Sequence, residues 1–210
     1  MTRSLPRMSG RQIALVGLLA LFAECAVAEE DMHAHHHHMA AAPQGVLRSE
    51  VGVSIPRVAM VRQDGAKVIF PDELDDGRPV ILSFIYTTCT AICPVVSQVL
   101  AQTQERLAKN AEPVHLVSVS IDPEHDTPAQ LLDYAKRFNA GPQWQHYTGT
   151  VQSSITLQTA FGAYSGDKMN HTPVTFLRSA PGQRWVRLDG FASDNDLVAE
   201  YRRFAQIKSQ

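Results

Sequence analysis

Two mainly apolar runs constrain the fold of this 210-residue chain most strongly. They are residues 79–86 (PVILSFIY) and 114–121 (VHLVSVSI), and each has the length of a single β-strand. Runs of this kind, without the alternation of a half-exposed strand, are typical of strands covered on both faces by helices. We therefore expect an α/β fold with these two strands near the centre of its sheet.

Segments with helical character alternate with these strands. Thr127 and Thr150 stand where N-caps are expected, and Pro128 suits the first position of a helix. Strands alternating with helices predict a sheet with helices on both faces. The predicted helices cover residues 94–109, 128–138, 151–161 and 193–204.

The remaining strands are shorter. The dipeptide Asp64-Gly65 lies between two of them and favours a tight hairpin turn. The element order is thioredoxin-like: an α/β fold whose central mixed sheet is flanked by helices, with an N-terminal β-hairpin extension. The predicted short strands are 58–61, 67–70, 144–147, 174–177 and 184–188.

Residues 1–28 have the pattern of a signal peptide. Three arginines within the first 11 residues precede an apolar run, and Ala26-Val27-Ala28 fits a cleavage site. The apolar run is shorter than the roughly 20 residues that a membrane helix needs. We therefore expect export to the periplasm, with an uncleaved inner-membrane anchor as the alternative. Residues 46–210 are then expected to form one thioredoxin-like domain.

Residues 29–45 form a leader with no hydrophobic periodicity, which we expect to be disordered. It holds five of the nine histidines of the chain. Imidazole and thioether groups are metal ligands, so we interpret the leader as an accessory metal-collecting tail. A purification tag or a merely solvated segment is the alternative. The predicted tail ligands are Met32, His33, His35, His36, His37, His38 and Met39.

Removal of residues 1–28 would also change the charge and the cysteine content. It would take away three Arg and one Glu, so the formal charge would move from −2 to −4. Such a mildly acidic chain lacks the basic surplus of nucleic-acid-binding proteins. Cys25 would be lost as well, which leaves Cys89 and Cys93 as the only cysteines. A lone close pair in an oxidising compartment forms a disulfide or is kept reduced for a purpose.

Cys89 and Cys93 lie between the strand 79–86 and the helix 94–109. The N-terminal end of a helix favours thiolate. Two thiolates at this spacing can bind one soft ion such as Cu(I), or they can close a disulfide and act as a redox couple. A structural zinc site would need four protein ligands, and an inert disulfide across so short a loop would stabilise little. Activity as a thiol–disulfide oxidoreductase therefore stays open beside metal binding.

The residues around these cysteines resemble the Sco/SenC family. Residues 83–89 (SFIYTTC), followed by Cys93-Pro94, are similar to that family's signature F-I-Y-T-x-C-x-x-x-C-P. Residues 119–128 (VSIDPEHDTP) resemble the family's V-D-P-E-x-D-T-P turn. The resemblance covers roughly residues 48 to 206. Its further matches are 147–150 (YTGT), 161–162 (FG) and 169–172 (MNHT).

The resemblance implies a protein that serves the assembly of copper centres, above all the dinuclear copper site of cytochrome c oxidase. It implies that Cys89, Cys93 and His171 bind one copper ion, as Cu(I) or Cu(II), or that the cysteines reduce another protein's disulfide. The expected partner is a copper-site protein such as cytochrome c oxidase subunit II, together with other periplasmic copper carriers. No nucleic acid is expected as a partner.

Two positions depart from the family's pattern. Asn170 stands where the family commonly has Asp, and the loss of that carboxylate removes a charge that would orient the imidazole. Pro173 follows Thr172, and an X-Pro bond adopts cis at little cost. A cis Pro173 would crowd the copper position and favour disulfide exchange, whereas a trans Pro173 would simply begin the next strand.

The other histidines of the domain have no motif to support a role as ligands. We expect His115 to be packed within its strand or at a sheet edge and His125 to be exposed to solvent. We expect Asp122 to organise the turn after its strand by accepting nearby N–H groups.

Overall fold

The structure, a computed structural model, describes residues 45–207. The predicted signal peptide and the tail ligands of the leader lie outside the described residues. The helices are α1 (Ile92–Lys109), α2 (Pro128–Arg137), α3 (Val151–Ala160) and α4 (Asp194–Ile207), with short 3₁₀ turns η1 (Asp72–Leu74) and η2 (Lys168–Asn170). The strands are β1 (Leu47–Val51), β2 (Val58–Arg62), β3 (Lys67–Phe70), β4 (Val80–Ile85), β5 (His115–Ser120), β6 (Trp144–Gly149), β7 (Val174–Arg178) and β8 (Trp185–Asp189).

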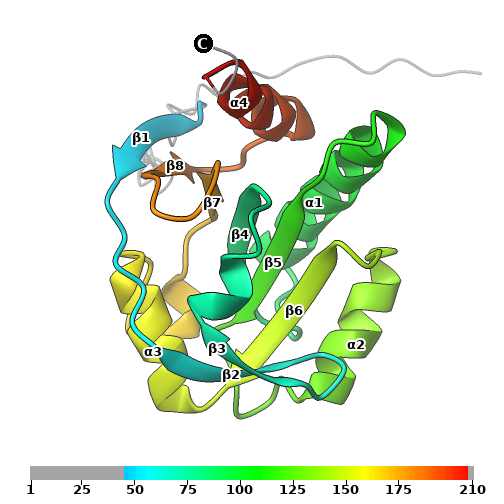
Figure 1. The fold of residues 1–210 in the computed structure, drawn as a ribbon. Coiled ribbons are helices and arrows are strands. Elements are labelled where there is room, and N and C mark those ends of the chain that lie inside the picture. Colours follow the sequence, from blue (N-terminus) through cyan, green and yellow to red (C-terminus); the bar gives the residue numbers. More distant parts are fainter. Residues whose placement is uncertain (1–44, 208–210) are drawn as a thin grey trace, which may run out of the picture. The chain divides into compact units, whose positions relative to one another are not determined.

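These strands form one mixed sheet, as predicted, in the order β1-β8-β7-β4-β5-β6-β2-β3 (Figure 1). The two buried runs form the adjacent strands β4 and β5, which pair in parallel. β6 continues the parallel part, while β7, β8 and the β2–β3 hairpin pair antiparallel. The thioredoxin-like sheet with its hairpin extension is therefore confirmed.

Helices cover both faces of the sheet, and alternate residues of β4 face the two sides. Ile81 packs into a core with α1 and α4. Leu82 and Phe84 pack into a second core with Leu157 of α3 and with residues of the β2–β3 hairpin. Alternation along a strand that is buried throughout explains why the sequence of β4 is continuously apolar.

The helix boundaries agree with the capping signals in the sequence. Thr127 and Gln130 form a capping box at the start of α2, and the Thr150 hydroxyl caps α3. α1 begins at Ile92, two residues before the predicted start, so Cys93 lies in its first turn. None of the helices in the described part of the chain has the length and apolarity that a membrane crossing requires.

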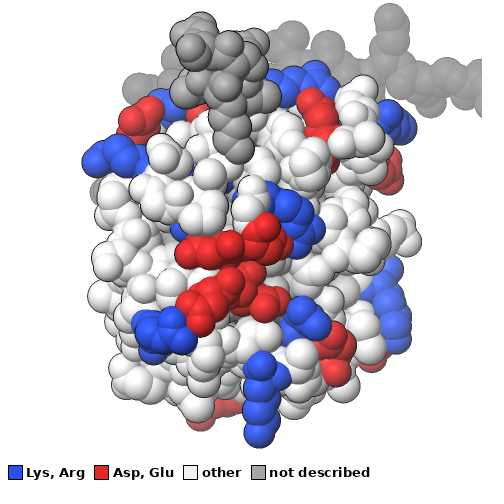
Figure 2. Space-filling view, in the orientation of Figure 1, with Lys and Arg blue, Asp and Glu red and all other residues white. Residues whose placement is uncertain are grey.

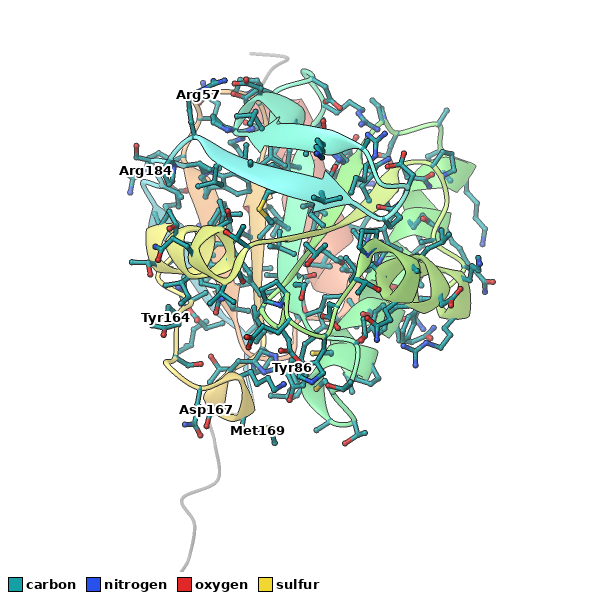
Figure 3. The ribbon with its side chains drawn as sticks, turned by 90° about the horizontal axis from the view of Figure 1, so that it is seen from below. Arg57, Tyr86, Tyr164, Asp167, Met169 and Arg184 are labelled. Carbon is teal, nitrogen blue, oxygen red and sulfur yellow. The ribbon has the colours of Figure 1, made fainter. Side chains whose placement is uncertain are left out.

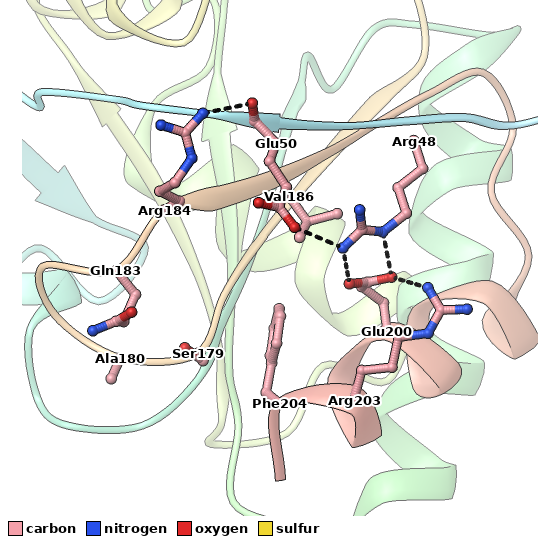
Figure 4. A pocket seen from close by; sticks show the side chains of 10 residues that line it. All are labelled: Arg48, Glu50, Ser179, Ala180, Gln183, Arg184, Val186, Glu200, Arg203 and Phe204. Atoms are coloured by element: carbon pink, nitrogen blue, oxygen red, sulfur yellow. Dashed lines mark hydrogen bonds and ion pairs between the residues drawn. The ribbon is translucent and has the colours of Figure 1, made fainter. Parts of the chain in front are cut away.

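β1 is an edge strand that the sequence pattern did not predict, because four of its five residues are exposed. Its first residue, Leu47, pairs with Asp189 of β8, which in turn pairs with Val174 of β7. Glu200 of α4 is buried and accepts two hydrogen bonds from Arg48 of β1, at 2.8 and 2.9 Å (Figure 4). These contacts lie beside a cavity of about 430 Å³ between β1, α4 and the β7–β8 turn, and they hold the edge strand to the helix.

Acidic side chains gather at the centre of the face in Figure 2, over the segment that joins β3 to β4. Each of them is paired with an arginine, so the segment is held by ion pairs as well as by packing. The pairs are Asp72 with Arg57, Glu73 with Arg62, Asp75 with Arg178 and Asp76 with Arg78.

Two buried histidines stand in the sheet. His115 is packed within β5, as expected, and its Nε2 lies 3.4 Å from the Tyr147 hydroxyl. His146 of β6 is fully buried, stacks on Trp144 with ring centroids 5.0 Å apart, and has no hydrogen-bond partner at either ring nitrogen. Burial lowers the pKa of His115 to about 4 and the pKa of His146 to about 3.

These histidines should make the free energy of unfolding depend on pH. The unfolded chain takes up a proton at each histidine below about pH 6.5, whereas the folded chain keeps both neutral. The free energy of unfolding should therefore be highest above pH 6.5 and decrease as the pH is lowered. For His146 alone, the decrease between about pH 7.5 and pH 5 should be about 2 kcal/mol. Urea unfolding at the two pH values tests this.

His146→Phe, which keeps a flat ring on Trp144, should lose about that share of the pH dependence. His125→Asn changes an exposed histidine and serves as the control. An unchanged pH dependence in His146→Phe would show that His146 is not the buried neutral group described here.

Candidate metal and redox site

Cys89 and Cys93 lie where β4 passes into α1. Tyr86, which directly follows β4, lies toward the bottom of Figure 3. Cys89 is 8% exposed and Cys93 is fully buried, and both are free thiols. The Sγ atom of Cys89 accepts the backbone N–H of Cys93 at 3.4 Å. Because the N-cap residue Ala91 offers no side-chain acceptor, the sulfur of Cys89 caps α1.

The two thiols differ in acidity. Burial acts to raise the pKa of Cys89, but the N–H groups of Cys93 and Ala91 outweigh it and lower the pKa overall. Burial raises the pKa of Cys93 well above its usual value, although its Sγ accepts the Tyr86 N–H at 3.4 Å. The helix end thus favours thiolate at Cys89 and leaves the proton on Cys93.

His171 follows η2 and brings its ring to the cysteines. Its Nε2 lies 3.6 Å from the Cys93 Sγ, while its Nδ1 lies 3.2 Å from the Lys168 carbonyl oxygen. A carbonyl oxygen only accepts, so Nδ1 carries the proton and Nε2 presents its lone pair to the sulfur. Burial lowers the pKa of His171, which keeps the ring neutral. A neutral imidazole held in this tautomer is the form that binds metal.

The His171 loop is anchored by Asp122, at the end of β5. The Asp122 carboxylate accepts from the Lys168 ammonium at 2.5 Å and from His125 Nδ1 at 3.2 Å. The turn itself is closed by the backbone carbonyl of Asp122, which accepts the N–H groups of His125 and Asp126. The expectation that the Asp122 side chain would accept those N–H groups is therefore wrong, because the side chain reaches across to Lys168 instead.

Asp126 is a positioning residue that the sequence did not reveal as such. Its fully buried carboxylate accepts from the Thr87 N–H at 3.2 Å, from the Thr87 hydroxyl at 2.5 Å and from the Ser120 hydroxyl at 2.6 Å. It thereby joins the segment that leads to Cys89 to the end of β5. The sequence feature that could have indicated this role is the position of Asp126 in the 119–128 turn, directly before Thr127, the N-cap of α2.

Tyr86 contacts both His171 and Met169. Its ring meets the His171 ring edge to face, with centroids 5.5 Å apart. Its hydroxyl donates to the Met169 sulfur at 3.7 Å. Burial, together with the hydrogen bond and charge of Cys89, raises the pKa of Tyr86 to about 12, so the hydroxyl remains a donor.

The two departures from the family's pattern have different outcomes. Within the described residues the cis bond is Phe70–Pro71, so Thr172–Pro173 is trans and the hypothesis of a cis Pro173 that crowds the site is wrong. Pro173 instead leads directly into β7. The Asn170 side chain is exposed, and the orientation of His171 comes from the Lys168 carbonyl.

The structure thus brings Cys93 and His171 together and places Cys89 beside them. His115 and His146 lie within the sheet. The His125 side chain is 62% exposed. Among the described residues, no group of three or more His, Cys, Asp or Glu side chains stands at metal-binding separations. A metal bound by Cys89, Cys93 and His171 would therefore have to draw these side chains closer together.

Replacing Asp126 by Asn should loosen the cysteine loop. The amide NH₂ group would replace one carboxylate oxygen and would face hydrogen-bond donors of Thr87 or Ser120, from which it cannot accept. Hydrogen bonds to a charged acceptor would therefore be lost. We expect the free energy of unfolding to fall by about 2 kcal/mol and alkylation of Cys93 to become faster.

Urea unfolding and mass spectrometry after timed iodoacetamide treatment measure the two effects. Asp133→Asn removes an exposed carboxylate of α2 and is the matched control. If Asp126→Asn behaves like Asp133→Asn, Asp126 does not hold the loop.

The sequence of this chain matches a known protein family. The SCO1/SenC family model matches residues 58–206. The SCO1 protein homolog of Bacillus subtilis is 34% identical over 110 residues, which are 52% of this chain and 56% of that protein. The mitochondrial SCO1 homolog 1 of Arabidopsis thaliana is 28% identical over 151 residues, or 68% of this chain and 44% of that one. The chain spans about half the length of these curated relatives.

Solved structures of similar proteins share the fold. The copper-bound crystal structure of Arabidopsis thaliana ScoI matches with a TM-score of 0.60 at 25% identity, over 75% of this chain and all of that one (100%). A SCO1/SenC family lipoprotein from Bacillus anthracis matches with a TM-score of 0.65 at 21% identity, over 76% and 99% of the two chains. Since the family model covers more than half of the sequence, the chain belongs to the SCO1/SenC family.

Proposed function

We propose that this chain is an exported copper metallochaperone that binds one copper ion through Cys89, Cys93 and His171. The observation that carries the proposal is the neutral imidazole nitrogen facing a buried thiol at 3.6 Å, next to a second, acidified thiol. Thiolates and imidazole together accept copper in both oxidation states. The similar ScoI of Arabidopsis thaliana has been crystallised with copper bound, which supports the same cargo for this chain.

The recipient we propose is a copper-site protein such as cytochrome c oxidase subunit II. BsSco, with which this chain shares 24% identity and a TM-score of 0.64, is described as a member of a family of cytochrome c oxidase assembly proteins. The signal-peptide pattern of residues 1–28 supports a periplasmic location, where such copper sites are assembled. Cys93 would release its proton as copper binds, and Cys89 would bind as the thiolate that the helix end favours, since the thiolate is the ligand.

Thiol–disulfide reduction is the second candidate, and the unequal thiols favour it. The Cys89 thiolate would attack a sulfur of the partner's disulfide and release the other sulfur as a thiolate. Cys93 would then pass its proton to His171 Nε2 and attack Cys89, which frees the partner's second thiol and leaves a Cys89–Cys93 disulfide. BsSco is described as having a disulfide switch.

Copper titration of the reduced full chain separates the two candidates. Competition with bicinchoninate for Cu(I) should show one tight ion that Cys89→Ser or Cys93→Ser removes. His171→Ala should weaken this ion by about tenfold or more, because a ligand is lost. Gln152→Ala, which changes an exposed side chain of α3, should leave the affinity unchanged.

Unchanged affinity in His171→Ala would remove the imidazole from the copper site. If the reduced chain binds no copper that depends on Cys89 and Cys93, the metallochaperone proposal fails. Reduction of oxidised glutathione by the same sample would then support the reductase.

The leader should add copper capacity without changing the thiols. We expect the full chain to bind more copper ions than a variant whose five leader histidines are Ala and whose Met32 and Met39 are Leu. The alkylation rates of Cys89 and Cys93 should be equal in the two proteins. Equal copper-to-protein ratios by elemental analysis would mean that the leader takes no part.

A further inference from the structure

Met169 is unusually placed for a large apolar residue. It sits in η2, two residues before His171, and is 70% exposed. Burying a methionine side chain would be favourable, so core packing does not account for this position.

Although exposed, Met169 is held in place. Its backbone N–H donates to the Asp167 carboxylate at 2.9 Å, and its sulfur accepts from the Tyr86 hydroxyl at 3.7 Å. The preceding residue, Lys168, is fixed by Asp122. Figure 3 shows Tyr86, Asp167 and Met169 at the same end of the molecule. The thioether is thus tethered at the solvent side of the site.

Tyr86 connects this sulfur to the inner ligands. Its ring packs against His171, and its N–H donates to the Cys93 sulfur. Cys89, Cys93 and His171 are each less than a tenth exposed. An ion from solvent would therefore reach the exposed residue Met169 before it reached them.

We propose that Met169 is an outer ligand through which Cu(I) reaches and leaves the Cys89, Cys93 and His171 site. This inference rests on the proposed copper function. A thioether is a soft, neutral ligand that suits Cu(I). A single thioether holds the ion weakly enough to release it to thiolates, which replace it ligand by ligand without any change of oxidation state. A proton leaves only from a thiol that is still protonated when it binds, which is Cys93.

The test compares rates with affinities in the full chain. Met169→Leu keeps the size of the side chain and removes the sulfur. In stopped-flow transfer from Cu(I)–bicinchoninate, we expect loading and release both to slow by at least about threefold, with little change in equilibrium affinity, since both directions use the same step. Met60→Leu makes the same substitution in the buried core and should leave the rates unchanged.

A second measurement detects the outer ligand directly. In the Cys89→Ser/Cys93→Ser chain with ¹³C-methyl-labelled methionine, the Met169 methyl signal should shift on addition of Ag(I), a soft analogue of Cu(I). Met169→Leu assigns that signal, and the Met60 signal should stay unmoved.

The outcomes separate the two proposals. If Met169→Leu loads copper at the wild-type rate and the Met169 methyl signal does not shift in the labelled chain, the proposal that Met169 is an outer ligand is wrong. The proposed site at Cys89, Cys93 and His171 would be unaffected by that result. If wild-type protein loads no copper at the cysteines, the metallochaperone proposal fails. A methyl shift with Ag(I) would then still support a soft-metal contact at Met169.

Discussion

The short turn between β5 and α2 fixes both halves of the candidate site. Asp126, at its end, binds Thr87 and so sets the path of the segment that carries Cys89. Asp122, at its start, binds Lys168 and so sets the turn that carries His171. Two carboxylates four residues apart thus position side chains that are separated by more than 80 residues in the sequence. Without the contacts of this turn, the thiols and the imidazole would not be held at fixed positions relative to each other.

The site favours a thiolate at Cys89, but its three candidate ligands are too far apart to share one metal ion. The first turn of α1 stabilises negative charge at Cys89, while burial keeps Cys93 protonated. His171 is neutral and already in the tautomer that leaves Nε2 free. The side chains are therefore chemically prepared for a soft cation, although their separations are wider than those of a single coordination sphere. The same unequal thiols suit disulfide exchange, so one arrangement serves both candidate activities.

The sequence predicted the fold well because local signals and burial agree. The apolar runs of β4 and β5, the caps at Thr127 and Thr150, and the hairpin turn each mark an element that the structure contains. β1 gave no such signal, since an exposed edge strand needs no apolar pattern. The roles of Asp122 and Asp126 depend on contacts between distant segments, which periodicity and spacing do not encode. The trans bond before Pro173 likewise follows from the path into β7, and composition does not reveal it.

The pairing of β1 determines where the leader joins the domain. Leu47 lies across β8 from Val174, the first residue of the strand that follows His171, so these two residues are two strand spacings, or about 10 Å, apart. Met39 precedes Leu47 by eight residues, a tether that spans at most about 28 Å when fully extended. If the leader binds copper as proposed, an ion held at Met39 would stay within that length of Leu47 along the chain. Delivery from the leader would then be an intramolecular event, independent of the amount of protein present.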